Sequence, residues 1–256
     1  MKIDLEDFKA LIQKNTKVLY IETPSNPLLK ITDLKAVSKI AKQHGLVSMI
    51  DNTFASPVNQ NPIDFGIDVI IHSATKYMGG HSDICAGAVA STSENIERIF
   101  QLAKNLGGSL SDQTVWLLER SMKTMGLRVK AQNENAQRMA EYLHVHADIA
   151  AVFYPGLPSH PDHKLAKSQM RGFGAMLSFE LIDSLDAEAF QNQLNLIKSS
   201  MSLAGVESTM LSPHLTSHAL LTQDERDRIG ISNQLIRFSV GIEDVRDLKR
   251  DIDTAI

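Results

Sequence analysis

The stretch Leu46-Val47-Ser48-Met49-Ile50-Asp51-Asn52-Thr53 sets the expected fold, because a short apolar run ends abruptly in three polar residues. Such a run predicts a buried strand, and similar runs occupy residues 18–21 and 69–71. Between the first two runs, residues 34–41 carry apolar side chains three or four apart behind a Thr32-Asp33 cap, which predicts a helix. Apolar strands separated by such crossovers are typical of a parallel sheet that is covered on both faces.

A polar cluster follows each predicted strand. The three clusters are Ser25-Asn26, Asp51-Asn52-Thr53 and the segment 73–83. Open α/β sheets bind their ligands beyond the carboxyl ends of the strands. The sequence therefore predicts one site that is built from all three clusters.

The second half of the chain has a different pattern, which becomes helical from about Asp112. Its expected elements are a helix over 129–143, a strand over 174–181, a helix over 185–200, a strand over 235–240 and a short acidic helix from Glu243. This alternation predicts a second, smaller α+β domain. We expect an α/β protein whose domains cover residues 1–122 and 123–256.

Composition excludes several classes of protein. The 256 residues are 43% hydrophobic and 22% charged, which is too apolar for a disordered chain. The 26 basic and 30 acidic residues give a net charge of −4, so we expect no nucleic-acid partner. No run reaches the roughly 18 apolar residues of a membrane span. The single cysteine, Cys85, favours a reducing compartment, and we expect a cytoplasmic protein.

The segment Ser73-Ala74-Thr75-Lys76-Tyr77-Met78-Gly79-Gly80-His81-Ser82-Asp83 carries the most chemistry. Lys76 follows a buried strand, and partial burial is what lets a lysine lose its proton and act as an amine nucleophile. The hydroxyls of Ser73 and Thr75 can donate to a phosphate, and the glycines allow close backbone approach. The alternative is a surface loop with an ordinary solvated lysine.

Asp51 lies 25 residues before Lys76, at the end of the preceding predicted strand. A lysine that binds the cofactor covalently and a carboxylate on the ring nitrogen are what a pyridoxal phosphate enzyme needs. The carboxylate keeps the pyridine ring protonated, so that the ring can accept electrons. The alternative is that Asp51 is only a helix cap or a turn residue.

Several motifs together resemble the Cys/Met metabolism family of pyridoxal-phosphate enzymes. They are Tyr20-Ile21-Glu22-Thr23-Pro24-Ser25-Asn26-Pro27, Asp51-Asn52-Thr53-Phe54, residues 73–77 with 80–83, Tyr154-Pro155-Gly156-Leu157, Gly172-Phe173-Gly174 and residues 235–243. The resemblance covers nearly the whole chain in the right order. It implies pyridoxal 5'-phosphate as cofactor and fold type I, the aspartate-aminotransferase-like α/β architecture with a mostly parallel sheet.

The resemblance also implies a role for each cofactor-binding residue. Lys76 is the expected Schiff-base lysine and proton shuttle, and Asp51 is expected to pair with the pyridinium nitrogen. Ser73 and Thr75 are expected to bind the phosphate. Asn26 is expected to hydrogen-bond the ring hydroxyl or the substrate.

On the substrate side, Arg237 is expected to bind the substrate carboxylate through its planar, bidentate guanidinium. Because Arg237 lies in an apolar strand, a structural ion pair is the alternative. Ser202 matches a family serine near the lysine and the substrate carboxylate, so we expect a catalytic and substrate-binding role for it.

The family's reactions are eliminations or replacements at a sulfur-bearing or activated amino acid, such as cystathionine, an O-acyl homoserine or cysteine. Its members include cystathionine γ-synthase, cystathionine γ-lyase, cystathionine β-lyase and methionine γ-lyase. Met201 stands where members acting on cystathionine or activated homoserine often have an acidic residue, and Ala204 stands where glycine is commoner. The first three activities therefore stay open, with methionine γ-lyase as a further alternative.

In the family, an N-terminal stretch on the order of a hundred residues precedes the region that resembles Lys2 onward. It brings a phosphate loop, an aromatic that stacks on the cofactor, and residues that reach a neighbouring subunit. We expect residues 1–122 to be the C-terminal part of the large domain. The competing hypothesis is a truncated, non-catalytic fragment acting as a scaffold, whereas the full-length protein is expected to form a homotetramer.

Other polar residues point to packing or surface roles. The pairs His144/His146 and His160/His163 lack matching cysteine or carboxylate spacing, so no metal site is expected. We interpret His160 and His163 as surface residues. Cys85 has no evident basic partner besides His81, which favours a buried packing role.

Overall fold

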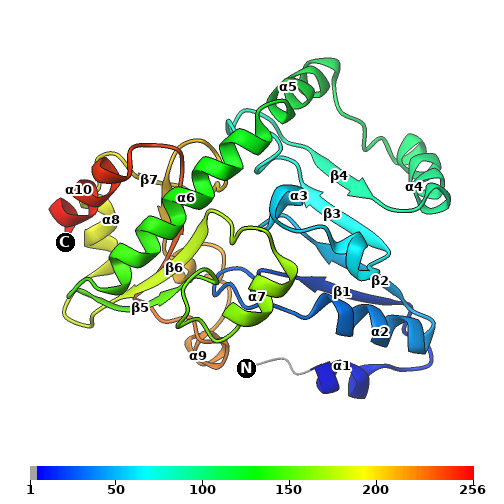
Figure 1. Ribbon diagram of the computed structural model, residues 1–256, viewed down its shortest axis with the longest axis horizontal. Helices are drawn as coiled ribbons and strands as arrows, with labels where there is room; N and C mark the ends of the chain where they lie inside the picture. Colours follow the sequence, from blue (N-terminus) through cyan, green and yellow to red (C-terminus); the bar gives the residue numbers. More distant parts are fainter. Residues whose placement is uncertain (1–4) are drawn as a thin grey trace.

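The computed structural model describes residues 5–256. In its first half, a four-stranded sheet has the order β1-β2-β3-β4, in which β1 to β3 are parallel and β4 is antiparallel (Figure 1). The strands are β1 (Val18–Glu22), β2 (Val47–Asp51), β3 (Val69–Ser73) and β4 (Gly87–Ala90). The three strands predicted from apolar runs are confirmed. The strand β4 was not predicted, because Gly-Ala-Val-Ala is short, exposed and poor in strand-forming residues.

Helix α2 (Leu34–His44) connects β1 to β2, as the helical spacing predicts. The side chain of Asp33 accepts a hydrogen bond from the Ala36 N–H at its start, and Gly45 ends it in the left-handed conformation with φ 64°. Its apolar face packs against β1 and β2 and forms one core cluster with them. The short helix α1 (Leu5–Leu11) contacts α2.

The expectation that both faces of this sheet are covered is wrong for the described chain. Burial alternates along β1 and β2, because α2 covers only one face. On the other face Val18 is 40% exposed, Tyr20 is 53% exposed and Val47 is 39% exposed. The sequence could not show this, since a strand buried on one face and one buried on both can carry similar apolar runs.

Three helices lead from the first sheet to the second: α4 (Ser93–Leu106), α5 (Asp112–Met122) and α6 (Met125–His144). Helix α5 begins at the predicted residue, whereas α4 was not predicted. Both α4 and α5 project from the molecule (Figure 1), and no apolar residue in either is buried. A domain boundary at 122/123 stays a prediction, and it would fall in the turn between α5 and α6.

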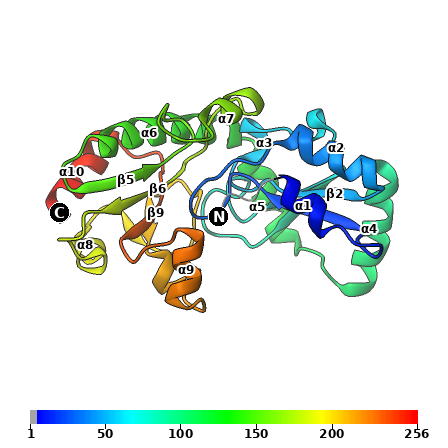
Figure 2. The same cartoon turned by 90° about the horizontal axis from the view of Figure 1, so that it is seen from below.

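The second half is built on a five-stranded sheet of order β5-β6-β9-β8-β7. Its strands are β5 (Ile149–Phe153), β6 (Met176–Leu181), β7 (Lys198–Ser199), β8 (Thr209–Leu211) and β9 (Leu235–Ser239). Helices α6, α8 (Ala187–Gln193) and α10 (Val245–Ala255) pack with this sheet in the largest core cluster (Figure 2). The predicted strands at 174–181 and 235–240 and the predicted last helix are confirmed.

The predicted helix over 185–200 is much shorter in the structure, where α8 ends at Gln193. The carboxylate of Asp251, on α10, accepts hydrogen bonds from the backbone N–H groups of Asn195, Leu196 and Ile197 at 2.8–3.0 Å. These bonds hold residues 195–197 in a non-helical conformation. A partner 54 residues away in the sequence thus overrides the local periodicity.

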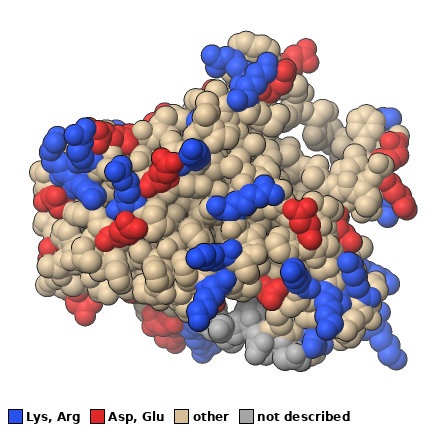
Figure 3. Space-filling view, viewed as in Figure 1, with Lys and Arg blue, Asp and Glu red and all other residues tan. Residues whose placement is uncertain are grey.

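The remaining elements are short. They are α3 (Ser56–Asn59), η1 (Pro62–Phe65), α7 (His163–Gln169), η2 (Pro213–Leu215) and α9 (Gln223–Ile229). Acidic and basic side chains are interspersed on the face shown in Figure 3. Lys35, Lys39 and Lys42 are exposed on α2. No helix of residues 5–256 is both long enough and apolar enough to cross a bilayer.

Candidate active site

The ends of the parallel strands bring two of the predicted site residues to one edge and one face. In the register, Asp51 pairs with Ile71 of β3, and Ser73 lies two residues further along that strand. Because side chains alternate along a strand, Asp51 and Ser73 point to the same side of the sheet. This is the uncovered side, which also carries Tyr20.

Backbone and side-chain bonds fix these strand ends. The carboxylate of Asp51 accepts the Thr53 N–H through Oδ1 at 2.9 Å, and the Thr53 hydroxyl accepts the Ser73 N–H at 2.8 Å. Among the described residues, neither Asp51 Oδ2 nor the Ser73 hydroxyl has a hydrogen-bond partner. One carboxylate oxygen and one hydroxyl are therefore available to a ligand at this edge.

Lys76 lies in the turn that follows β3. Its backbone N–H donates to Ser73 O at 3.1 Å, and its carbonyl accepts the Gly80 N–H at 2.7 Å. The side chain is half-buried, and Nζ has no hydrogen bond or ion pair within residues 5–256. Burial first, and the charge of Arg237 second, lower the pKa of Lys76. The nearby Cys85 acts in the opposite direction.

The Thr75 hydroxyl is less available than that of Ser73. It accepts the Ala86 N–H at 2.9 Å and donates to Ala86 O at 3.3 Å. These bonds join the lysine turn to the segment that leads into β4. A phosphate could still approach the Thr75 oxygen, but its proton already has a partner.

Arg237 comes from the other sheet, in the middle of β9, and is only 4% exposed. Its guanidinium donates to Met201 O at 2.9 Å and to Asn26 Oδ1 at 3.4 Å. No carboxylate forms an ion pair with Arg237 in the described part of the chain, so the structural ion pair is not found there. Burial lowers the pKa of Arg237 to about 10, a value at which the group stays charged at neutral pH.

Asn26 and Ser202 approach the site in different ways. Asn26 lies in the loop after β1, between cis peptide bonds at Thr23-Pro24 and Asn26-Pro27, and contacts Arg237 directly. Ser202 follows Met201, and among residues 5–256 only its backbone forms hydrogen bonds: its N–H donates to the Ser200 hydroxyl and its carbonyl accepts from the Thr209 hydroxyl. No hydrogen bond joins Ser202 to Lys76 among the described residues.

A buried amide network that the sequence did not reveal supports this edge. Gln60 is 1% exposed and donates to Asn52 Oδ1 at 2.8 Å and to Thr23 O at 3.2 Å, which ties the ends of β1 and β2 together. Gln169 in turn donates to Gln60 Oε1 at 3.2 Å. No local pattern marks these residues, because their partners lie 8 to 109 residues away in the sequence.

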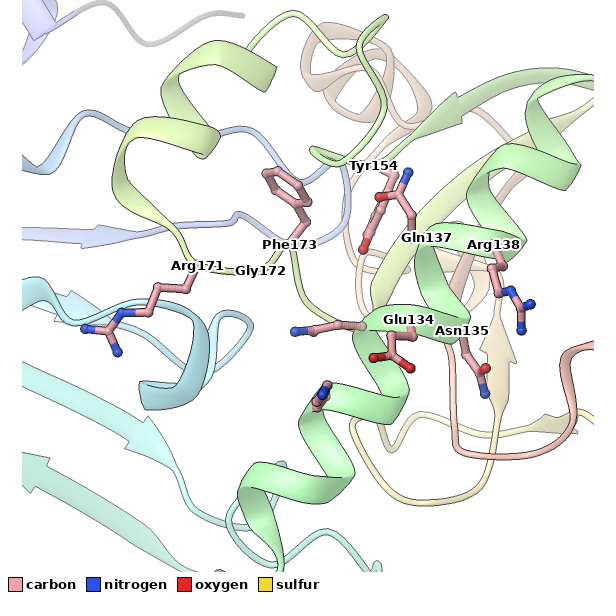
Figure 4. Close-up of a pocket in the computed structure, with 10 residues that line it drawn as sticks. Glu134, Asn135, Gln137, Arg138, Tyr154, Arg171, Gly172 and Phe173 are labelled. Carbon is pink, nitrogen blue, oxygen red and sulfur yellow. The ribbon is translucent and has the colours of Figure 1, made fainter.

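A hollow of about 630 Å³ lies elsewhere, between α6 and the loop 171–173 (Figure 4). Exposed Glu134 and Arg138 line its helical side, whereas Arg171 points away from them toward Asp64, with 3.9 Å between the charged atoms. None of the predicted site residues lines this hollow. We do not assign this hollow as the active site despite its size, because the charged side chains that line it are exposed to solvent.

Two minor predictions are wrong. His160 is 7% exposed rather than on the surface, and burial lowers its pKa. Cys85 is exposed rather than buried. Among the described residues, no group of three or more histidine, cysteine, aspartate or glutamate side chains is placed to hold a metal ion.

The donor set fits pyridoxal phosphate. Lys76 offers an amine with a lowered pKa, Asp51 a carboxylate oxygen without a partner, Ser73 a free hydroxyl, and Arg237 a buried cation without an anion. The last of these matters most, because a buried guanidinium without a counter-ion is costly unless a ligand brings the negative charge. Fold and site together define a pyridoxal-phosphate-dependent enzyme of fold type I.

Comparison with known proteins leads to the same class. Residues 2–256 match the model of the family described as "Cys/Met metabolism PLP-dependent enzyme", and the chain belongs to this family. It is 46% identical over 254 residues to cystathionine β-lyase of Lactococcus lactis, a match that covers 99% of this chain and 67% of that protein. It is 44% identical to cystathionine γ-lyase of Bacillus subtilis, with 98% and 66% covered.

The same relationship holds among solved structures. Cystathionine γ-lyase from Lactobacillus plantarum, solved with L-serine, superposes with a TM-score of 0.96 at 44% identity, over 98% of this chain and 66% of that one. The chain thus spans about two thirds of the length of these relatives. Relatives with different activities have similar sequence identity to this chain, so sequence identity alone does not separate a β-lyase from a γ-lyase.

Proposed function

We propose that the protein catalyses γ-replacement, or γ- or β-elimination, on cystathionine or an activated homoserine with pyridoxal phosphate as cofactor. The observation that carries this proposal is the pairing of Lys76, an amine with a lowered pKa, with Arg237, a buried cation that lacks an anion. An α-amino acid has one carboxylate and one Cα proton, and these two groups suit that pair. The family membership supports the same class of substrate.

Each residue has a defined task in this proposal. Arg237 binds the substrate carboxylate, and Asn26 holds the guanidinium in place through Oδ1. Lys76 Nζ accepts the Cα proton of the substrate and then donates it to another carbon within reach. The lowered pKa of Lys76 favours the neutral amine, which is the form that accepts the proton. Ser73, with Thr75, holds the phosphate.

When bound, the cofactor supplies an aldehyde for amines and a protonated ring that accepts electrons from the substrate Cα. Asp51 keeps the ring nitrogen protonated through its partner-free carboxylate oxygen. Ser202 is proposed to orient the substrate from the loop beside Arg237, where Met201 O already contacts the guanidinium.

Absorption spectroscopy tests the cofactor assignment. Pyridoxal phosphate is added to the purified chain, to Lys76→Ala and to Lys39→Ala, whose lysine is exposed on α2. We expect a visible absorption band in the parent and in Lys39→Ala, and none in Lys76→Ala. A band that persists in Lys76→Ala would overturn the assignment.

Product analysis tests the reaction. Cleavage of the Cγ–S bond of cystathionine leaves cysteine, whereas cleavage of its Cβ–S bond leaves homocysteine. Replacement instead joins cysteine to an O-acyl homoserine and releases the carboxylic acid. Mass spectrometry of each mixture identifies the activity, and release of methanethiol from methionine would point to the methionine γ-lyase alternative.

We further propose a homotetramer in the cytoplasm. The exposed apolar side chains of α4 and α5, among them Phe100 and Trp116 at 56% and 61% exposure, support an assembly that covers them. Sedimentation velocity measures the oligomeric state. A monomer at all concentrations would contradict the assembly and leave the cofactor assignment untouched.

A further inference from the structure

Two polar side chains on α6 lie in the interior, where the helix passes behind the proposed active site. Arg128 is 6% exposed and Gln132 is fully buried. They are four residues apart, so they lie one turn apart on the same face of the helix. Val129 and Ala136, also fully buried, show that this is the core-facing side. Neither polar residue takes part in the proposed chemistry.

The guanidinium of Arg128 is surrounded by backbone carbonyls. It donates to Tyr77 O at 2.9 Å, to Met78 O at 3.4 Å and to Ser121 O at 2.9 Å, while Nε donates to the Thr124 hydroxyl at 3.1 Å. No carboxylate pairs with it among the described residues. A buried cation that only carbonyls and a hydroxyl satisfy contributes little net stability, so its fixed fork geometry is its evident contribution.

The first two carbonyls belong to the lysine loop, which we define as residues 76–80. At the end of this loop Gly80 has φ +71°, and a Cβ there would lie 1.9 Å from Arg128 Nη1. The Arg128 guanidinium therefore packs directly against the Gly80 backbone. The Gly80 N–H donates to Lys76 O at 2.7 Å, so Arg128 holds the segment that determines where the lysine side chain begins.

Gln132 contacts the backbone on the Arg237 side of the proposed site. Its Nε2 donates to Gly205 O at 2.7 Å and to Val240 O at 3.4 Å. Gly205 belongs to the serine loop, defined as residues 201–206, and Val240 directly follows the strand that carries Arg237. The two loops also meet, because the Val206 N–H donates to Gly80 O at 2.9 Å.

We propose that Arg128 and Gln132 are positioning residues through which α6 sets the distance between the Lys76 amine and the Arg237 guanidinium. The inference rests on the proposed function, in which Arg237 holds the substrate carboxylate while Lys76 moves the Cα proton. These two groups come from different sheets, and one rigid helix contacts the backbone on both sides. Proton transfer needs the reacting atoms within hydrogen-bond reach, so the helix fixes a catalytic distance.

Hydrogen exchange of the cofactor-free chain is the first test. The variants are Arg128→Gln and Arg128→Lys, and the matched control is Arg138→Gln, whose arginine is exposed on the same helix. In Arg128→Gln we expect exchange at Gly79, Gly80 and Val206 to be about tenfold faster or more, because their amides depend on the held loop. Arg128→Lys keeps the charge and should lie between parent and Arg128→Gln. The control should match the parent.

The pH dependence of the Lys76-dependent absorption band is the second test. If the lysine loop moves away from Arg237, the apparent pKa of the band rises in Arg128→Gln, by about 0.5 or more, and rises less in Arg128→Lys. A merely structural arginine would lower the melting temperature and leave this pKa unchanged. Circular dichroism verifies that each variant is folded.

Gln132→Met gives an independent check, because it removes the amide and keeps the volume. We expect faster exchange at Val206 with Gly79 unchanged. Unchanged exchange and unchanged band pKa in Arg128→Gln overturn the positioning role and leave the proposed function standing. A parent chain with no Lys76-dependent band overturns the proposed function, whatever the exchange rates are.

Discussion

The two sheets hold the residues of the proposed site in opposite ways. In the first sheet, Asp51 and Ser73 stand at strand ends, half-exposed, with polar neighbours. In the second, Arg237 stands in the middle of β9, a strand that is buried along its whole length. A strand end keeps polar groups hydrated at little cost, whereas a strand interior holds a charge only at the expense of stability. The comparison shows that one site can combine strand-end residues that hardly affect stability with a buried residue that lowers the free energy of unfolding.

Asp51→Asn tests the strand-end half and should have the largest effect. The amide retains an oxygen for the Thr53 N–H but cannot keep a ring nitrogen protonated. With cofactor and amino acid present, we expect exchange of the Cα proton with D₂O to slow on the order of 10³-fold. Proton NMR measures this rate. Asp83→Asn is the control, since Asp83 is an exposed aspartate in the segment 73–83. A rate within tenfold of the parent would contradict the role of Asp51.

Arg237→Met tests the strand-interior half. Amino-acid affinity should fall about 100-fold, because a desolvated charge pair typically contributes 2–5 kcal/mol. The free energy of unfolding should be unchanged or rise, by up to about 4 kcal/mol, since a buried cation without a counter-ion is removed. Titration with an amino acid and urea denaturation measure the two quantities. A marked decrease in the free energy of unfolding would contradict the expectation that burial of Arg237 destabilises the fold.

The same variant shifts the pKa of Lys76. Burial and the Arg237 charge both lower this pKa, so without the charge it should rise toward the ordinary value of 10.5 while burial still acts. At any pH below the pKa, a smaller fraction of the amine is then neutral, and Lys76 should react more slowly. Competitive acylation of the cofactor-free chain, read by mass spectrometry across pH, measures this. Arg246→Met, at an exposed arginine, should leave the profile unchanged.

Ala204→Gly should have the smallest effect and sharpens the view of the serine loop. Ala204 has φ 61°, a conformation that favours glycine, and is fully buried. Relief of backbone strain should offset the lost methyl, so the stability change should stay within about 1 kcal/mol.

Ala175→Gly is the matched control for this change. Ala175 is equally buried and does not have a positive φ, so its methyl is lost without relief. It should be destabilised more than Ala204→Gly by about 1 kcal/mol. Thermal denaturation of both variants measures the difference, and equal losses would mean that position 204 is not strained.

Much of the first sheet was predictable from the sequence. Its parallel strands appear as apolar runs, and the polar residues that follow them predicted one shared edge, on which Asp51 and Ser73 do lie. The second half of the chain was harder to predict from the sequence. The helix predicted over 185–200 is shorter than expected and ends at Gln193, because the Asp251 carboxylate accepts hydrogen bonds from the backbone N–H groups of residues 195–197. Buried His160 and exposed Cys85 also departed from prediction, since burial depends on distant neighbours.

The supporting residues were hidden for the same reason. Arg128 and Gln132 follow the core periodicity of α6, so the available signal was two polar residues at buried positions. That signal does not say which carbonyls they hold. Gln60 and Gln169 lie in no local pattern, and their roles emerge only from tertiary contacts, such as the hydrogen bond between them across 109 residues of chain.

The sequence by itself determined the class of protein and the chain order of the motifs, and it supplied the residue types of the proposed site, because these depend on local patterns. Only the tertiary structure decided which groups meet: that the charge of Arg237, on another sheet, acts on Lys76, that Asn26 Oδ1 and Met201 O hold the guanidinium, and that much of one face of the first sheet stays exposed. The physical reason is that desolvation and hydrogen bonding depend on neighbours in space.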